Sequence, residues 1–318
     1  MTYQPASLSN DLDPLRKLPV WVTSGRAETP ETVAFRSGAA LTVLDALVTD
    51  QRFGVPTKLL ANQLALTAAT ATSKLEGRLA READIRDAYH LTPAGEARGP
   101  DGDLLAFWRD AVRVRLSGRD WLKNLIGFVG PNFEYDVEGW MDAGATRAKT
   151  HGPLAGCVSV MRAVLDLDDR AERIACLLSD VVLARALNWT SVLPVTAQRL
   201  TKAMLRGLAA DGQGGALVIQ ASLLTSIENT IPIARDLSSR AAALRAVAPK
   251  LRAKGSEAAV ALFLSEDAVA PSIALSPMIQ GTTIPMTDRA ARRFCDRLVE
   301  LGVARELTGR PTFRLYGL

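Results

Sequence analysis

The sequence predicts a mainly α-helical protein with a multi-helix body and a C-terminal winged helix. Of the 318 residues, 48% are hydrophobic but only 5% are aromatic, and alanine and leucine dominate, which favours helices over a β-sandwich. Long segments repeat apolar residues at spacings of three and four, the period of an amphipathic helix. Residues 285–318 instead combine one basic amphipathic helix with a short hairpin pattern.

Composition divides the chain into a leader and two domains. Residues 1–33 are rich in Pro, Ser, Thr and Asp around an apolar patch at 18–22, so we expect a loosely ordered leader with one anchor. Residues 34–254 form the helical domain. Gly255 and Ser256 mark the next boundary, because Ser256 can cap a helix over 257–266. Residues 255–318 are then the winged-helix domain.

The body is expected to consist of helices separated by two loops. Residues 92–103 and 127–139 are dense in Gly and Pro and predict the loops. The apolar spacing predicts helices at 34–48, 57–91 with a break near Gly77, 104–115, 140–149, 153–165, 170–187, 194–209, 215–229 and 233–253.

The last helix carries the clearest signals in the chain. Thr287 is a suitable N-cap, and Gly302 stands where a helix needs a left-handed residue to stop. Between them, apolar residues form one stripe. The stripe consists of Ala291, Phe294, Cys295, Leu298, Val299 and Leu301.

After this helix, residues 303–307 and 312–316 alternate around Thr308–Pro311, the pattern of a β-hairpin. Seven arginines minus four acidic residues leave residues 285–318 with a charge of +3, most of the chain's +4. A helix followed by a basic hairpin is how a winged helix ends, and such modules commonly bind DNA.

We therefore expect the helix to enter the major groove of double-stranded DNA, because arginine suits contacts to phosphates and guanine edges. The candidate contacts are Arg289, Arg292, Arg293, Arg297, Arg310 and Arg314. The alternative is a protein-interaction module that does not bind DNA, since basic helix faces are also found simply solvated.

Catalytic and metal-binding motifs are scarce, so we expect no cofactor or metal and the case for an enzyme is weak. Cys157, Cys176 and Cys295 form no Cys-x-x-Cys pair and stand among apolar neighbours, as reduced core thiols do. His90 and His151 lack partners at metal-ligand spacing. A rival enzymatic site in the body would consist of Glu76, Arg78, Arg86 and Asp87.

Several short segments resemble the domain-of-unknown-function 1403 family of bacterial proteins, which is common on plasmids. The residues that carry the resemblance are 64–69, 75–78, 82–88, 99–100, 288–293 and 306–318. The resemblance spans nearly the whole chain and implies membership of a family without an assigned reaction.

A second resemblance is to Fic-type nucleotidyl transferases. Residues 72–77, Thr-Ser-Lys-Leu-Glu-Gly, are similar to the Ser/Thr-x-x-x-Glu-Gly/Asn inhibitory helix of that family, and its members often end in a winged helix. The catalytic His-Pro-Phe loop is missing, because His151 is followed by Gly-Pro-Leu. The resemblance therefore implies at most a degenerate relative without the histidine base.

The sequence leaves the role of the body open among partner binding, homodimerisation and ligand sensing. Residues 1–14 lack the charged leader and apolar core of a signal peptide, and no run of eighteen apolar residues occurs. We therefore expect a cytoplasmic protein without a membrane span. From the basic helix and hairpin of residues 285–318, we expect it to act as a DNA-binding regulator.

Overall fold

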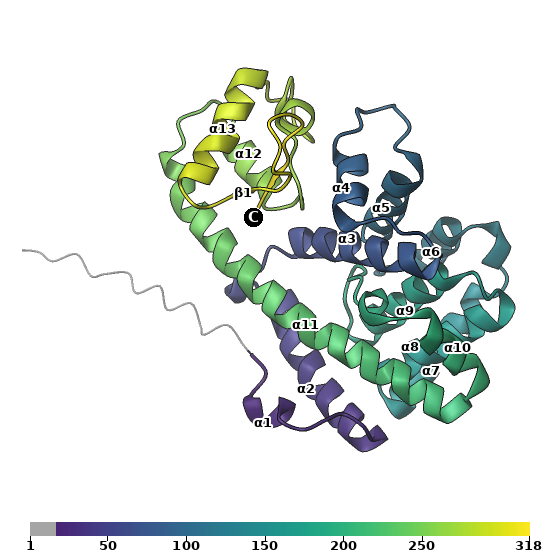
Figure 1. Cartoon of the computed structure of the whole chain (residues 1–318). Coiled ribbons are helices and arrows are strands. Elements are labelled where there is room, and N and C mark those ends of the chain that lie inside the picture. The colour runs from purple at the N-terminus through teal and green to yellow at the C-terminus, as the bar shows by residue number, and fades with distance from the viewer. Residues whose placement is uncertain (1–16) are drawn as a thin grey trace, which may run out of the picture.

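The computed structural model describes residues 17–318, and these residues are mainly helical (Figure 1). The first part of the predicted leader, residues 1–16, lies outside the described residues. The helices of the body are α1 Val20–Thr23, α2 Pro30–Thr49, η1 Gln51–Phe53, α3 Thr57–Leu75, α4 Glu82–His90, α5 Gly99–Ala111, α6 Trp121–Val129, η2 Pro131–Phe133, α7 Val137–His151, α8 Pro153–Leu167, α9 Glu172–Ala186, η3 Thr196–Arg199, α10 Lys202–Ala210 and α11 Gly212–Val247.

Residues 255–318, here called the C-terminal segment, follow η4 Ala248–Lys250. The C-terminal segment contains α12 Ser256–Phe263, η5 Pro271–Leu275, α13 Asp288–Glu300, β1 Arg305–Glu306 and β2 Tyr316–Gly317. Strands β1 and β2 pair antiparallel, with Glu306 opposite Tyr316. On the other side of β2, Val269 and Tyr316 exchange both backbone hydrogen bonds, at 2.8 and 3.0 Å.

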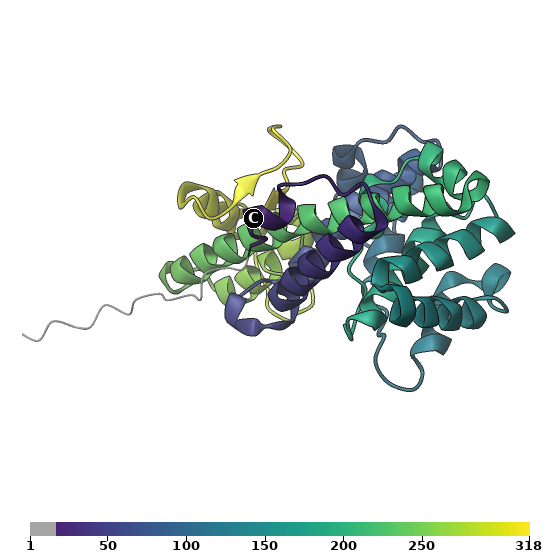
Figure 2. The same ribbon diagram turned by 90° about the horizontal axis from the view of Figure 1, so that it is seen from below.

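Helix α11 runs the length of the molecule, from α8 and α10 at one end to the C-terminal segment at the other (Figures 1 and 2). Its 36 residues contain Pro232, where the sequence predicts two separate helices. That prediction is wrong. One turn before the proline, Glu228 accepts a bidentate pair of hydrogen bonds from Arg36 of α2 at 2.7 and 2.8 Å. Packing against α2 therefore keeps α11 continuous although a proline cannot donate to the preceding turn.

Most other predicted helices are confirmed with shifted ends. The break near Gly77 is confirmed, because α3 ends at Leu75 and Gly77 has φ +80°. Helix α2 begins at Pro30, ahead of the predicted start, because Thr29 and Thr32 form a capping box.

Three predicted boundaries are wrong. Helix α5 begins at Gly99, inside the predicted loop 92–103, because Pro100 is tolerated in a first helical turn. Helix α6 occupies residues 121–129, where the sequence predicts no helix before the loop at 127–139. The predicted helix 194–209 is interrupted, since α10 starts only at Lys202, which Thr201 caps.

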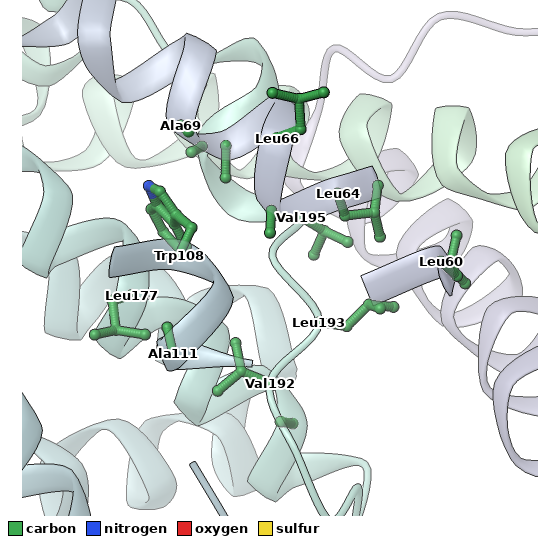
Figure 3. Packing of buried hydrophobic residues seen from close by; sticks show 14 of the residues in the cluster. Leu60, Leu64, Leu66, Ala69, Trp108, Ala111, Leu177, Val192, Leu193 and Val195 are labelled. Carbon is green, nitrogen blue, oxygen red and sulfur yellow. The ribbon is translucent and has the colours of Figure 1, made fainter. Parts of the chain in front are cut away.

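Most of the core is one hydrophobic cluster that runs from the body into the C-terminal segment, where Ala268, Ala270 and Leu315 form a second, small cluster. Figure 3 shows its centre, where the Trp108 ring of α5 packs beside Ala69 of α3 and Leu177 of α9. The indole Nε1 of Trp108 donates to the Thr72 hydroxyl at 3.0 Å, so its polar atom is satisfied in the core. The division of the chain at residue 255 stays a prediction.

Close helix packing in the body depends on two glycines. A Cβ at Gly144 of α7 would lie 2.5 Å from Val160, and one at Gly156 of α8 would lie 2.6 Å from the Gly144 carbonyl. The absence of side chains at both positions lets α7 and α8 approach each other closely.

Two helical stretches, Pro30–Thr49 and Gly212–Lys250, are long and apolar enough to cross a membrane by length and composition alone. The core helix of a soluble protein passes the same test, so this is weak evidence. The expected cytoplasmic location stays a prediction.

Candidate nucleic-acid interface

Helix α13 presents two chemically different faces. Ala291, Phe294, Cys295 and Leu298 are buried, as their spacing predicts, whereas Val299 of the predicted stripe is exposed. The Thr287 hydroxyl accepts a hydrogen bond from the Ala290 amide at 3.3 Å, which confirms the predicted cap. Gly302, with φ +69°, ends the helix. The predicted arginines lie on the exposed face.

Within that exposed face, the arginines differ in their partners. Arg292 pairs with Asp288 at 2.7 Å and Arg297 pairs with Glu300 at 2.9 Å, both along the same helix. Arg289 and Arg293, one turn apart, have no carboxylate within salt-bridge distance in residues 17–318. Their positive charges are therefore not neutralised by the part of the protein that the structure describes.

A groove of about 640 Å³ lies beside these two arginines. Its other wall is formed by residues 250–253, at the end of η4 and the start of the connection to α12, which supply Lys250 and Arg252, and its apolar lining includes Leu251 and Phe294. The cations that line this groove, here called the cationic groove, are Lys250, Arg252, Arg289, Arg293 and Arg297. Within the described residues, no acidic side chain lines it. A concave surface of one sign of charge concentrates an anionic partner.

The hairpin is shorter than predicted, and its arginines are engaged inside the protein. The strands are reduced to 305–306 and 316–317, joined by residues 307–315, here called the hairpin loop. At its start, the Glu306 carboxylate accepts hydrogen bonds from the amides of Thr308 and Gly309, at 2.8 and 2.7 Å. Burial raises the pKa of Glu306, but these hydrogen bonds outweigh it and the pKa is lowered.

The two predicted contacts in the hairpin loop meet acids of the same chain. Arg310 pairs with Asp87 of α4 at 2.9 Å, and Arg314 lies 3.8 Å from Asp296 of α13. Neither guanidinium is as available to an external anion as Arg289 or Arg293. Two of the candidate contacts, Arg289 and Arg293, are therefore unpaired within the described residues, whereas the other four meet acids of the same chain, Arg297 among them although it lines the cationic groove.

The polar residues predicted as a site in the body do not form one cluster. Glu76 is held by Arg173 of α9 at 2.5 Å and lies 3.8 Å from Arg78. Arg86 pairs with its neighbour Asp87 at 2.9 Å, and Asp87 also holds Arg310. Both groups tie elements together, and the second ties α4 to the hairpin loop.

A buried ionic cluster, which the sequence analysis did not identify, joins α5 to the C-terminal segment. The Arg109 guanidinium of α5 donates to Glu266 and to Asp267, and all three side chains are buried. His90 lies 3.3 Å from Asp267, and Arg109 lies over the Tyr89 ring at 5.0 Å. The adjacent acids at 266–267 inside an apolar run were the available signal, because buried acids need partners.

This cluster fixes the ionisation of its acid. Burial raises the pKa of Asp267, but the charge and hydrogen bond of His90 and the charge of Arg109 outweigh burial, so the pKa is lowered. Burial likewise lowers the pKa of Arg109, and the charges of Asp267 and Glu266 more than restore it. The buried ion pairs of this cluster hold the C-terminal segment against the body.

The three cysteines are buried and free, as predicted for core thiols. Burial raises the pKa of each thiol above its ordinary value, so the reactive thiolate is suppressed.

The family described as "Protein of unknown function (DUF1403)" matches residues 6–318, nearly the whole chain. None of the curated proteins compared with the chain matches it. The similarity to Fic-type transferases is not shown; Thr72 and Glu76 are engaged by Trp108 and Arg173. Because this match covers residues 6–318, the chain belongs to the DUF1403 family.

Proposed function

We propose that the C-terminal segment is a winged helix that binds double-stranded DNA and that the protein is a DNA-binding regulator. The observation that carries this proposal is the cationic groove, in which five cations gather beside α13 with no acid among the described lining residues. Neutralising phosphates with Lys and Arg releases counterions, which supplies most of the affinity of DNA-binding proteins.

The order of elements supports the winged-helix assignment. Helix α12 is followed by the extended residue Val269, the short helix η5, helix α13 and the β1–β2 pair. Val269 pairs with β2, so three extended segments lie beside one another. In this proposal α13 is the recognition helix and the hairpin loop is the wing.

The distribution of charge refines which residues make contact. Arg289 and Arg293 are the principal contacts because no described carboxylate competes for them. Lys250 and Arg252 would add phosphate contacts from the opposite wall of the groove. Arg310 and Arg314 take a secondary part, since Asp87 and Asp296 already hold them.

In this proposal the body positions the C-terminal segment. Arg109 with Glu266 and Asp267, and Arg310 with Asp87, fix the segment against α4 and α5. A change in the body on binding a partner, a ligand or a second copy of the chain would thereby reach the DNA-contacting surface.

The test is the fluorescence anisotropy of labelled duplex DNA, titrated with protein across a salt series. We expect the double variant Arg289→Ala/Arg293→Ala to weaken binding to all sequences and to flatten the slope of log affinity against log salt by about 2, one per lost phosphate contact. The matched control is Arg119→Ala/Lys123→Ala, which removes two exposed cations, one just before α6 and one in its first turn.

Equal affinities and salt slopes for the double variant and the unmodified protein would overturn the proposal. Loss of binding in the control variant as well would assign the effect to net charge rather than to the cationic groove. Absence of binding by the unmodified protein at low salt would favour the alternative, a module that docks proteins.

A further inference from the structure

The hairpin loop presents one aromatic side chain in an unusual way. Phe313 is 72% exposed, and its backbone has φ +52°, in the left-handed region. Among the described residues, Asn188 is the other non-glycine residue with a positive φ, and asparagine tolerates that conformation. An aromatic residue does not, and such strain is retained where the surrounding structure enforces it and is concentrated at functional sites.

The hairpin loop is held in this shape from within. The guanidinium Nε of Arg310 donates to the Phe313 carbonyl at 3.2 Å, and Nε of Arg314 donates to the Arg310 carbonyl at 3.2 Å. Arg310 is itself anchored to Asp87 of α4. The backbone on both sides of Phe313 is therefore fixed, while the ring faces solvent rather than a core.

The ring borders a concave surface that carries both arginines and an acid. Phe313 lines a groove of about 480 Å³ together with Pro271, Arg292 and Arg314, and Asp296 is the acid that lines it. This groove borders an adjacent part of the α13 surface, since Arg289 and Arg293 line the cationic groove and Arg292, about 60–100° around the helix from them, lines this one. A flat apolar ring can stack on a base, and guanidinium groups that line the same groove can contact the flanking phosphates.

We propose that Phe313 is a wedge that inserts between adjacent base pairs of duplex DNA when α13 binds the neighbouring groove. Apolar wedges of this kind partly unstack one base step and kink the duplex. This inference rests on the proposed DNA binding. It adds a sequence preference that α13 does not supply, because pyrimidine–purine steps such as TA unstack most easily.

The test uses duplexes that carry 2-aminopurine, a base analogue whose fluorescence rises on unstacking, at a TA step or at a GC step. We expect the full-length protein to raise the fluorescence at the TA step. Phe313→Ala should abolish that rise and weaken binding to the TA duplex about tenfold, as loss of one stacked base does. Phe313→Trp should preserve both, and Tyr135→Ala, which removes an aromatic side chain 90% exposed outside the C-terminal segment, should change neither.

The outcomes separate this inference from the proposed function. Unchanged affinity and fluorescence in Phe313→Ala, with binding still lost in Arg289→Ala/Arg293→Ala, would overturn the wedge and leave DNA binding intact. Tighter, Phe313-dependent binding to the single strand than to the duplex would also overturn it, in favour of stacking on unpaired bases. No binding to either duplex would overturn both proposals.

Discussion

Charged side chains are used differently in the body and in the C-terminal segment. In the body, Arg36 of α2 meets Glu228 of α11 in a half-buried bidentate pair, and Arg173 holds Glu76. On α13, Arg289 and Arg293 are exposed and have no described carboxylate partner. Arg36 and Arg173 thus hold helices of the body together, whereas Arg289 and Arg293 of α13 remain available to a partner outside the described chain.

This contrast shows that the net charge of a chain and a local cluster of unpaired cations give different information about a partner. A net charge of +4 says little about a partner, because it is the small difference between 38 basic and 34 acidic residues spread over the whole chain. What favours a polyanion is the gathering of cations without acids around one groove. The ionic cluster at Arg109 joins the two regions. Removing its cation is therefore the change from which we expect the largest effect.

The largest expected effect follows from Arg109→Met. The change leaves Glu266 and Asp267 buried without their cation, so we expect the free energy of unfolding to fall by about 3–5 kcal/mol. Denaturant unfolding followed by circular dichroism measures it. The control is Arg113→Met, four residues along the chain, where an exposed pair with Asp110 should be worth about 0.5 kcal/mol.

The same cluster predicts a dependence on pH. The pKa of Asp267 is lower in the folded protein than the ordinary 3.8. The ionised Asp267 therefore contributes fully to the free energy of unfolding above pH 3.8, and this contribution is lost as the pH falls through the folded pKa. Arg109→Met should shrink this acid-side loss of stability. Equal stability of the Arg109→Met and Arg113→Met proteins would show that the cluster does not join the two regions.

Asp180 of α9 is the exception in the body, because it is a buried acid without a cation. Its Oδ1 accepts from the amides of Val195 and Thr196 at 3.0 Å each, while its Oδ2 has no hydrogen-bond partner in the part of the chain that the structure describes. Burial raises the pKa of Asp180 to about 8, although these hydrogen bonds oppose the rise. The folded protein therefore keeps this proton at neutral pH.

Replacing Asp180 with Asn should stabilise the protein at pH 7. Between pH 4 and 8 the folded state binds more protons than the unfolded state, so the free energy of unfolding falls as the pH rises. Asp180→Asn keeps the acceptor oxygen and cannot titrate, so it should gain at least about 1 kcal/mol, the value of one pKa unit. Urea titrations at pH 5 and pH 7 measure it, with exposed Asp142→Asn as the control. A loss of stability at both pH values would contradict the protonated state.

Sequence signals were sufficient where they were local. The Thr287 cap, the Gly302 stop and the apolar spacing between them all belong to α13, and the helix forms as they predict. The exposed arginines followed from the same spacing. Two of the five cations of the cationic groove did not, because Lys250 and Arg252 reach it through tertiary folding from a different segment.

Where tertiary contacts decide, the sequence was insufficient. Pro232 predicts a helix end, yet packing and the Arg36–Glu228 pair, 192 residues apart, keep α11 whole. The partners of Glu76 and Arg310 are likewise distant in the chain, so a site assembled from neighbouring polar residues separated into two structural pairs. Nothing in a single sequence encodes which distant acid meets which arginine.

The smallest expected effect concerns the strained residue of the hairpin loop and compares stability with binding. We expect Phe313→Gly to be about 0.5–1 kcal/mol more stable than Phe313→Ala. Glycine adopts φ +52° without strain, and this gain exceeds the cost of the larger conformational entropy of glycine in the unfolded chain. At Thr312, where φ is not positive, the order of Gly and Ala should reverse. Thermal unfolding measures both pairs. Both Phe313 variants should lose binding to the TA duplex equally, since neither has a ring. If Phe313→Gly were no more stable than Phe313→Ala, the left-handed backbone at residue 313 would not be strained. This result would contradict the inference that strain is retained there to present the ring to a partner.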